Sequence, residues 1–211
     1  MSATHGQRVG LLGGTFDPVH NAHVALARAA LEEMQLAEVR WIPAGQPWQK
    51  TATRDVTPAV HRVAMVERAI AGEPRFVLDR IEVARAGPSV TLDTVRALKA
   101  TDPSTRWTLI IGADQYATLH TWRDWQALLA LVTLAVANRP GAVPPIDTAV
   151  LRHPHQAVPL PMLDISSTDV RRRVAAGQDI SKLVPPLVAR YIETNRLYQA
   201  GAAGGSTSVR S

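Results

Sequence analysis

The chain has 211 residues, of which 46% are hydrophobic, and it contains no cysteine. This length fits one domain with a full core, and the lack of cysteine excludes disulfides and thiolate metal sites. The formal net charge is +5. No basic stripe is interleaved with aromatic residues, so small polyanionic substrates fit this charge better than a nucleic acid does. No apolar run is long enough to span a bilayer, and we expect a cytoplasmic protein without a membrane partner.

Short apolar runs alternate with helical patterns along the chain. The runs predict strands over residues 8–12, 39–42, 75–78, 107–111, 132–137 and 157–160. This alternation predicts an α/β fold, a single domain over residues 1–199 with a doubly wound parallel sheet and C-terminal helices. Residues 200–211 are mostly glycine, serine and alanine, with no apolar pattern, which predicts a disordered tail.

The helices are expected at residues 24–34, after Thr57-Pro58, at 91–100 and at 125–131, followed by two near the C-terminus. Thr57 is expected to cap the second of these helices, with proline in its first turn. Ser167 is expected to cap a helix over residues 168–176, which Gly177 ends. Pro185-Pro186 is expected to open a last helix that runs toward Tyr198.

The most informative segment is GGTFDPVHNAH, residues 13–23, at the turn from the first strand into the first helix. Open α/β sheets hold phosphorylated ligands at such turns. Gly13 and Gly14 let the backbone approach a ligand closely, and His20 and His23 project to one side of the helix start. A zinc site would need a third ligand and usually a glutamate within the motif, and neither is present. A packing role for the histidines is the remaining alternative.

A second turn into a helix reads DISSTDVR, residues 164–171. The hydroxyls of Ser166, Ser167 and Thr168 gather at the helix N-terminus, and Arg171 follows one turn later. Such an arrangement predicts another anion site, because the amide groups and the dipole of a helix N-terminus favour negative charge. The alternative is an ordinary serine cap with a solvated arginine.

The two segments together resemble the HxGH and ISSTxxR motifs of a nucleotidyltransferase superfamily, with Ala22 in place of the glycine of HxGH. Four further segments resemble bacterial nicotinate-nucleotide adenylyltransferases: IIGAD, TWRDW, NRPG and PSVT, at residues 110–114, 121–125, 138–141 and 88–91. The resemblance runs from about Arg8 to Tyr198. It implies a Rossmann-like fold and the conversion of ATP and nicotinate mononucleotide into nicotinate adenine dinucleotide and pyrophosphate, with Mg²⁺ accompanying ATP.

The resemblance also implies a role for individual residues. Catalytic roles fall on His20, His23, Lys50 and Arg171, and no residue is assigned as a protein ligand for a metal. ATP contacts fall on Gly13, Gly14, Thr15, Phe16, Gly112, Asp114, Ser166, Ser167 and Thr168. Mononucleotide contacts fall on Thr91, Trp122 and Gln49. Gln49 stands where the family commonly has histidine, and it keeps a hydrogen-bond donor without the capacity for charge.

The expected chemistry requires no general base. The second pKa of a phosphate monoester is about 6, so the attacking phosphate is largely ionised at neutral pH. The protein's work is then to position the substrates and to neutralise charge. Three alternatives remain at this point: another phosphorylated acceptor such as nicotinamide mononucleotide, a nucleotide sensor without catalysis, and a nucleic-acid-binding domain. A homo-oligomer also remains open.

Overall fold

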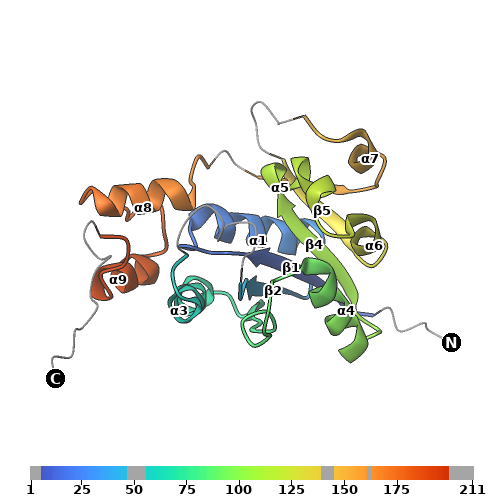
Figure 1. Cartoon of the computed structure of the whole chain (residues 1–211), viewed down its shortest axis with the longest axis horizontal. Coiled ribbons are helices and arrows are strands. Elements are labelled where there is room, and N and C mark those ends of the chain that lie inside the picture. The colour runs from blue at the N-terminus through green and yellow to red at the C-terminus, as the bar shows by residue number, and fades with distance from the viewer. Residues whose placement is uncertain (1–5, 47–55, 139–144, 161–162, 200–211) are drawn as a thin grey trace, which may run out of the picture.

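The computed structural model describes residues 6–46, 56–138, 145–160 and 163–199. These residues contain a six-stranded sheet in which every strand pairs in parallel with its neighbours (Figure 1). The strands are β1 (Arg8–Gly14), β2 (Glu38–Pro43), β3 (Phe76–Leu78), β4 (Arg106–Gly112), β5 (Thr133–Asn138) and β6 (Gln156–Pro159). Each lies within one or two residues of a predicted strand, so the predicted parallel α/β sheet is confirmed.

The strand order is β3-β2-β1-β4-β5-β6. The chain builds outward from β1 to β3 and then crosses back to place β4 on the other side of β1. In register, Val9 of β1 lies beside Glu38 of β2 and Trp107 of β4. A crevice opens beyond the carboxyl ends of the strands where the order reverses, and open α/β sheets bind their ligands there.

Helices cover both faces of the sheet, and each face has its own apolar cluster. One face carries α1 (Asn21–Glu33) and α3 (Ala59–Ile70), and its apolar cluster extends to α8 (Ser167–Ala175) and α9 (Pro186–Thr194). The other carries α4 (Thr91–Thr101), α5 (Ala113–Ala117), the 3₁₀ helix η1 (Leu119–Thr121), α6 (Trp125–Leu129) and α7 (Thr148–Leu151). The apolar run of β4, Leu109 to Ile111, is buried between the two layers, as the centres of parallel strands usually are. Among the described helices, none combines the length and the hydropathy needed to cross a membrane.

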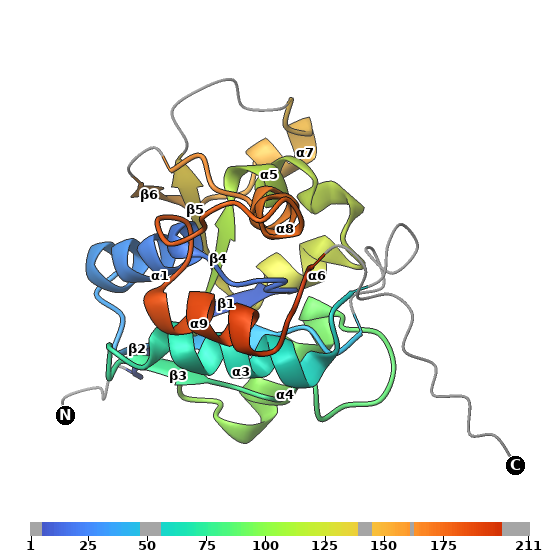
Figure 2. The same ribbon diagram turned by 90° about the vertical axis from the view of Figure 1, so that its left-hand side faces the viewer.

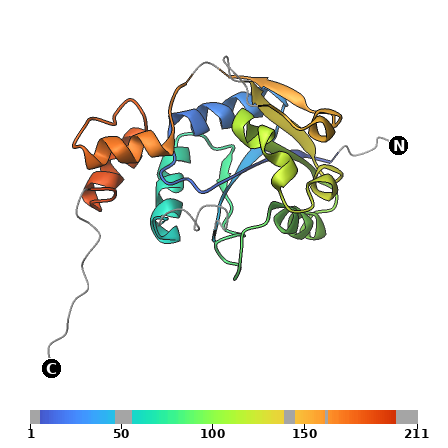
Figure 3. The same cartoon turned by 45° about the horizontal axis from the view of Figure 1, so that its top comes forward.

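The C-terminal helices lie together at the end of the molecule toward which the strands point. Figures 1 and 3 show α8 and α9 in orange and red, away from the N-terminus. Figure 2 shows α9 running beside α3, and these two helices are in contact. This packing brings the segment that follows α9 close to the segment that follows β1.

Two predicted helix caps are off by one residue. Pro58, rather than Thr57, is the N-cap of α3. Ser166, rather than Ser167, caps α8, because Ser166 has an extended backbone and its hydroxyl accepts the Asp169 N–H at 3.1 Å. The predicted stop is confirmed: Gly177 has a φ of 65°, in the left-handed region that glycine enters without a steric penalty. The last helix ends at Thr194, four residues before Tyr198.

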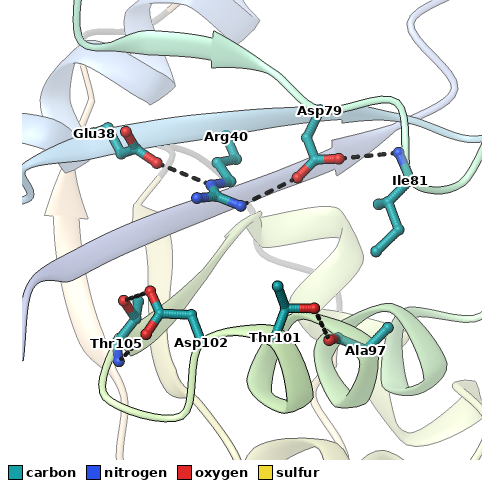
Figure 4. A network of polar contacts seen from close by, with 8 residues as sticks. All are labelled: Glu38, Arg40, Asp79, Ile81, Ala97, Thr101, Asp102 and Thr105. Atoms are coloured by element: carbon teal, nitrogen blue, oxygen red, sulfur yellow. Dashed lines mark hydrogen bonds and ion pairs between the residues drawn. The ribbon is translucent and has the colours of Figure 1, made fainter.

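A polar network anchors the chain where it leaves β3 (Figure 4). The Arg40 guanidinium donates to Glu38 at 2.9 Å and to Asp79 at 3.4 Å, and it lies 5.2 Å from the ring centroid of Trp107. The other Asp79 oxygen accepts the Ile81 N–H at 3.0 Å. Partly exposed ion pairs contribute only about 0–1 kcal/mol of stability. The network therefore matters chiefly because it fixes where the segment after Asp79 begins its path toward the cavity.

Candidate active site

A cavity of about 670 Å³ opens at the carboxyl ends of β1 and β4, in the crevice where the strand order reverses. Its walls come from the segments after β1, β2 and β4, from the start of α4 and from the N-terminus of α8. All the described residues to which the sequence assigned a role line this one cavity: Gly13, Gly14, Thr15, Phe16, His20, His23, Thr91, Gly112, Asp114, Trp122, Ser166, Ser167, Thr168 and Arg171. Lys50 and Gln49 lie outside the described residues.

Two cavity glycines leave space that no protein atom uses. A Cβ added at Gly13 or at Gly112 would meet no heavy atom within 4 Å. Neither strand end therefore needs glycine for packing, and the open space faces the cavity. Gly14 differs, because a Cβ there would lie 3.0 Å from the Phe16 ring. The protein's own packing accounts for Gly14, whereas the space at Gly13 and Gly112 is available to a ligand.

The turn after β1 has a strained backbone. Phe16 adopts a φ of 51°, in the left-handed region that costs a non-glycine residue about 1–2 kcal/mol. Its buried ring lies 5.1 Å from the His23 ring in an edge contact and 5.5 Å from Trp41. Backbone strain persists only where the surroundings hold it, and such residues cluster at functional sites. Aromatic packing thus holds the turn and also buttresses one face of His23.

His20 and His23 form a pair at the start of α1. The backbone N–H of His20 donates to Nδ1 of His23 at 3.2 Å, and the two rings stack with centroids 3.7 Å apart. Because Nδ1 of His23 accepts this bond, the neutral ring carries its proton on Nε2. His23 therefore presents an oriented N–H donor, and the predicted projection of both rings to one side is confirmed. Ala22, in place of the motif glycine, is buried and also lines the cavity.

The N-terminus of α8 is tied directly to the turn after β1. Arg171 donates to the Asp17 carbonyl at 2.7 Å and to the Thr168 hydroxyl at 3.3 Å. The Ser167 hydroxyl donates to the Pro18 carbonyl at 2.9 Å. Ser167 thus uses its hydroxyl to join the two segments rather than to cap the helix. The amide groups of the helix N-terminus and the Arg171 guanidinium supply the positive character of this wall.

The opposite wall contains a buried carboxyl group that the sequence did not single out. Glu82 is 8% exposed and accepts the Thr94 hydroxyl at 2.8 Å, while Arg85 donates to that hydroxyl at 3.3 Å. Burial raises the pKa of Glu82 above the usual glutamate range, against hydrogen bonds from Thr94 and Ser89 that act to lower it. Glu82 lies in a segment without regular structure, so no periodic pattern distinguished it from an exposed acid.

The chain leaving β2 is held against this wall. The Gly45 N–H donates to the Ser89 hydroxyl at 2.9 Å, and the Ser89 N–H donates to the Gln46 carbonyl at 3.0 Å. A Cβ on Gly45 would lie 2.2 Å from the Glu82 carbonyl oxygen, so the close approach requires glycine. These contacts set the point from which the segment carrying Gln49 and Lys50 departs.

A buried arginine is the second residue that the sequence did not single out. Arg62 is 1% exposed and donates to the carbonyls of Thr15, Thr57 and Ala44 at 2.8, 2.8 and 2.7 Å. It thereby joins the segments that leave β1 and β2. A signal was present, because Arg62 lies four residues before Val66 on the apolar stripe of α3. A charged residue at a core-facing position is buried only when it is well paired.

Comparison with known proteins places the chain in a family. A family model described as cytidylyltransferase-like matches residues 11–173. A probable nicotinate-nucleotide adenylyltransferase of Methylibium petroleiphilum is 45% identical over 210 residues, covering 97% of this chain and 98% of that protein. Its counterpart in Bordetella petrii is 47% identical over 199 residues, covering 92% and 100%. The chain belongs to the nicotinate-nucleotide adenylyltransferase family.

Solved structures agree with the fold. Plasmodium falciparum nicotinic acid mononucleotide adenylyltransferase, in its complex with NaAD, superposes with a TM-score of 0.75 at 22% identity, covering 91% of this chain and 97% of that one. A complex of the same protein with APC gives the same TM-score. At this identity the likeness establishes the fold alone. The expected Rossmann-like architecture is confirmed, and this member of the nicotinate-nucleotide adenylyltransferase family presents its phosphate-type motifs at the expected end of the sheet.

Proposed function

We propose that this protein transfers the adenylyl group of ATP to nicotinate mononucleotide, giving nicotinate adenine dinucleotide and pyrophosphate, a step of NAD biosynthesis. The observation that carries the proposal is the single cavity at the β1/β4 crevice. The HxxH turn and the α8 N-terminus meet there with Thr91 and Trp122. A polyphosphate and a second, aromatic mononucleotide can be held side by side in such a space.

The reaction would proceed in line at the α-phosphorus of ATP. An oxygen of the mononucleotide 5′-phosphate forms the new P–O bond, the bond to the β-phosphate bridging oxygen breaks, and pyrophosphate leaves with that electron pair. Since the nucleophile is already ionised, no proton has to be removed. Catalysis then rests on preorganised donors placed where negative charge develops.

The chain's own groups divide this work by position. The Nε2–H of His23, the neighbouring His20 ring and the amides of Thr15 and Phe16 would contact the α-phosphate. Arg171 and the α8 N-terminus would hold the β- and γ-phosphates and then the departing pyrophosphate. Lys50, which lies outside the described residues, remains a predicted phosphate contact. Positive groups on two sides of the turn suit an anion whose charge is spread over several oxygens.

The two substrates would enter from different walls. Adenosine would lie against Gly112 and Asp114 after β4, and the pyridine ring would stack on Trp122 near Thr91, with Gln49 a further predicted contact. Mg²⁺ would arrive with ATP as part of the substrate, held by phosphate oxygens and water. Asp17 does not suit a metal, because its carboxylate is 1% exposed and accepts hydrogen bonds from Tyr198 and Thr57. Location in the cytoplasm and the oligomeric state remain predictions.

The test is an assay with ATP, Mg²⁺ and nicotinate mononucleotide that measures dinucleotide and pyrophosphate separately. Equal amounts of both products are expected, with nicotinamide mononucleotide a poorer acceptor by kcat/KM. If nicotinamide mononucleotide is used equally well or better, the assigned acceptor is wrong, but the assignment of adenylyl transfer still holds. Binding of ATP without product on any mononucleotide acceptor would favour the nucleotide sensor and contradict the proposal.

A further inference from the structure

Asp17 lies in the turn after β1, but its carboxylate serves distant parts of the chain. The group is 1% exposed. The Tyr198 hydroxyl donates to one of its oxygens at 2.7 Å across a separation of 181 residues. The Thr57 N–H donates to the other at 3.4 Å. The carboxylate therefore joins the turn to the start of α3 and to the segment that follows α9.

These contacts close into a ring behind the turn. From Asp17 the ring passes to Thr57, whose carbonyl accepts from Arg62 at 2.8 Å. Arg62 then returns to the Thr15 carbonyl, also at 2.8 Å. The strained residue Phe16 lies between the two residues at which the ring reaches the turn. The ring thus holds both flanks of a conformation that the turn would not keep by itself.

Tyr198 attaches the segment after α9 to this ring. Its hydroxyl donates to one Asp17 oxygen at 2.7 Å, while the other Asp17 oxygen accepts the Thr57 N–H. Tyr198 itself has a φ of 63°, which turns the chain back after α9. Burial and the neighbouring Asp17 charge raise the pKa of Tyr198, so the hydroxyl keeps its proton and remains a donor under assay conditions.

The same turn residue positions the phosphate arginine. Arg171 donates to the Asp17 carbonyl at 2.7 Å, so any rotation of the turn at Asp17 moves an acceptor that orients Arg171. Tyr198, Asp17 and Arg171 form a connected path from the segment after α9 to the wall of the cavity. Tyr198 would therefore act on the substrate indirectly, through the position of Arg171, and not by touching it.

We propose that Tyr198 is a positioning residue for adenylyl transfer, which keeps the Thr15–Asp17 turn and Arg171 aligned on the ATP phosphates. The proposal rests on the proposed function for the reaction, but its ATP-binding consequence does not depend on the acceptor. If Tyr198 were merely structural, loss of its hydroxyl would lower the stability of the protein and leave substrate binding by the folded molecules unchanged. A positioning tyrosine would weaken the ATP side and spare the mononucleotide side.

The experiment compares Tyr198→Phe with Tyr191→Phe, which removes a hydroxyl from α9 that contacts Nδ1 of His61 at 2.9 Å, outside the cavity. Calorimetry measures MgATP binding without acceptor, and steady-state assays give kcat and both KM values. We expect Tyr198→Phe to lower kcat/KM for ATP and the MgATP affinity about tenfold, the scale of one hydrogen bond to a charged group. The KM for nicotinate mononucleotide should stay within about twofold, and Tyr191→Phe should match the parent protein.

A third variant tests the route of the effect. Asp17→Asn keeps the size of the side chain and removes its charge, and we expect the double variant Asp17→Asn/Tyr198→Phe to bind ATP no more weakly than the weaker single variant, because both changes break one brace. Parent-like ATP binding and kcat in Tyr198→Phe would overturn the inference, and so would equal losses in the two tyrosine variants. A parent protein that binds ATP but makes no dinucleotide would overturn the proposed function instead, while the calorimetric comparison would still decide the role of Tyr198.

Discussion

Replacing Gly13 with alanine should impair the use of ATP without lowering the stability of the fold. Gly13 lies in strand β1 and lines the cavity, and an added Cβ would meet no heavy atom within 4 Å. The methyl group would enter space that the protein does not fill. Because no neighbour has to move, the substitution tests whether this space belongs to the ATP phosphates.

The structure predicts that Gly13→Ala raises stability and lowers activity. A glycine-to-alanine change at a compatible backbone restricts the unfolded chain and stabilises a protein by about 0.4–1 kcal/mol. For a domain of this size that is roughly 1–4 °C in melting temperature. A methyl on the cavity floor would displace the phosphates by about 1 Å, a misplacement that costs about 100-fold in rate. We therefore expect Gly13→Ala to melt no lower than the parent and to lose about two orders of magnitude in kcat/KM for ATP.

Gly72→Ala is the matched control. A Cβ at Gly72 likewise meets nothing within 4 Å, but the residue follows α3 and lies outside the cavity lining. It should share the effect on stability and keep full activity. Thermal unfolding and dinucleotide formation measured on all three proteins would decide the question. Parent-like kcat/KM for ATP in Gly13→Ala would refute the reasoning, because the space would then not be used by the ligand.

Three further predictions concern other residues that line the cavity. His23→Asn keeps an acceptor for the His20 N–H and removes the Nε2 donor, so turnover should fall about 100-fold with little change in melting temperature; parent-like turnover would reduce His23 to a helix cap. Trp122→Ala should raise the KM for the pyridine mononucleotide about tenfold, with Trp122→Phe intermediate and the KM for ATP unchanged, whereas an equal loss for both substrates would contradict stacking. Burial raises the pKa of Glu82, so the folded state favours the protonated form and loses stability as the pH rises above about 4. The melting temperature of Glu82→Gln relative to the parent should therefore increase from about pH 4 to 7, and a pH-independent difference would oppose this sign.

The residues predicted to face the ligand could be identified from the sequence because they lie in short contiguous segments. Residues 13–23 begin at the end of β1, and Gly112 and Asp114 lie at the end of β4. A parallel sheet brings the ends of its strands to one edge. Local pattern was sufficient to predict that these segments meet. It was insufficient for helix caps, where Ser166 and Ser167 are chemically equivalent and only the backbone at the junction selects one.

The buried supports were not predictable from local pattern. Asp17 and Arg62 reach partners 181 and 47 residues away. Glu82 bonds Thr94 only 12 residues along the chain, but it lies in a segment without a periodic pattern. A buried polar group must find partners or destabilise the protein. Of the three, only the burial of Arg62 could have been inferred from the sequence. Its position on the apolar stripe of α3 required either burial with partners or a break in the stripe.

This division between facing and supporting residues has a consequence for the C-terminal helices. The cytidylyltransferase-like match ends at residue 173, before α9 begins at Pro186, yet the Asp17 carboxylate at the heart of the turn accepts from Tyr198 beyond that helix. The strained Phe16 turn thus draws part of its support from outside the region covered by that match. Packing of α9 on α3 brings Tyr198 and Thr57 to the same Asp17 carboxylate, so α9 serves the phosphate turn as well as the apolar cluster that it covers. Loss of the Tyr198–Asp17 contact should therefore weaken ATP binding before the sheet itself is destabilised.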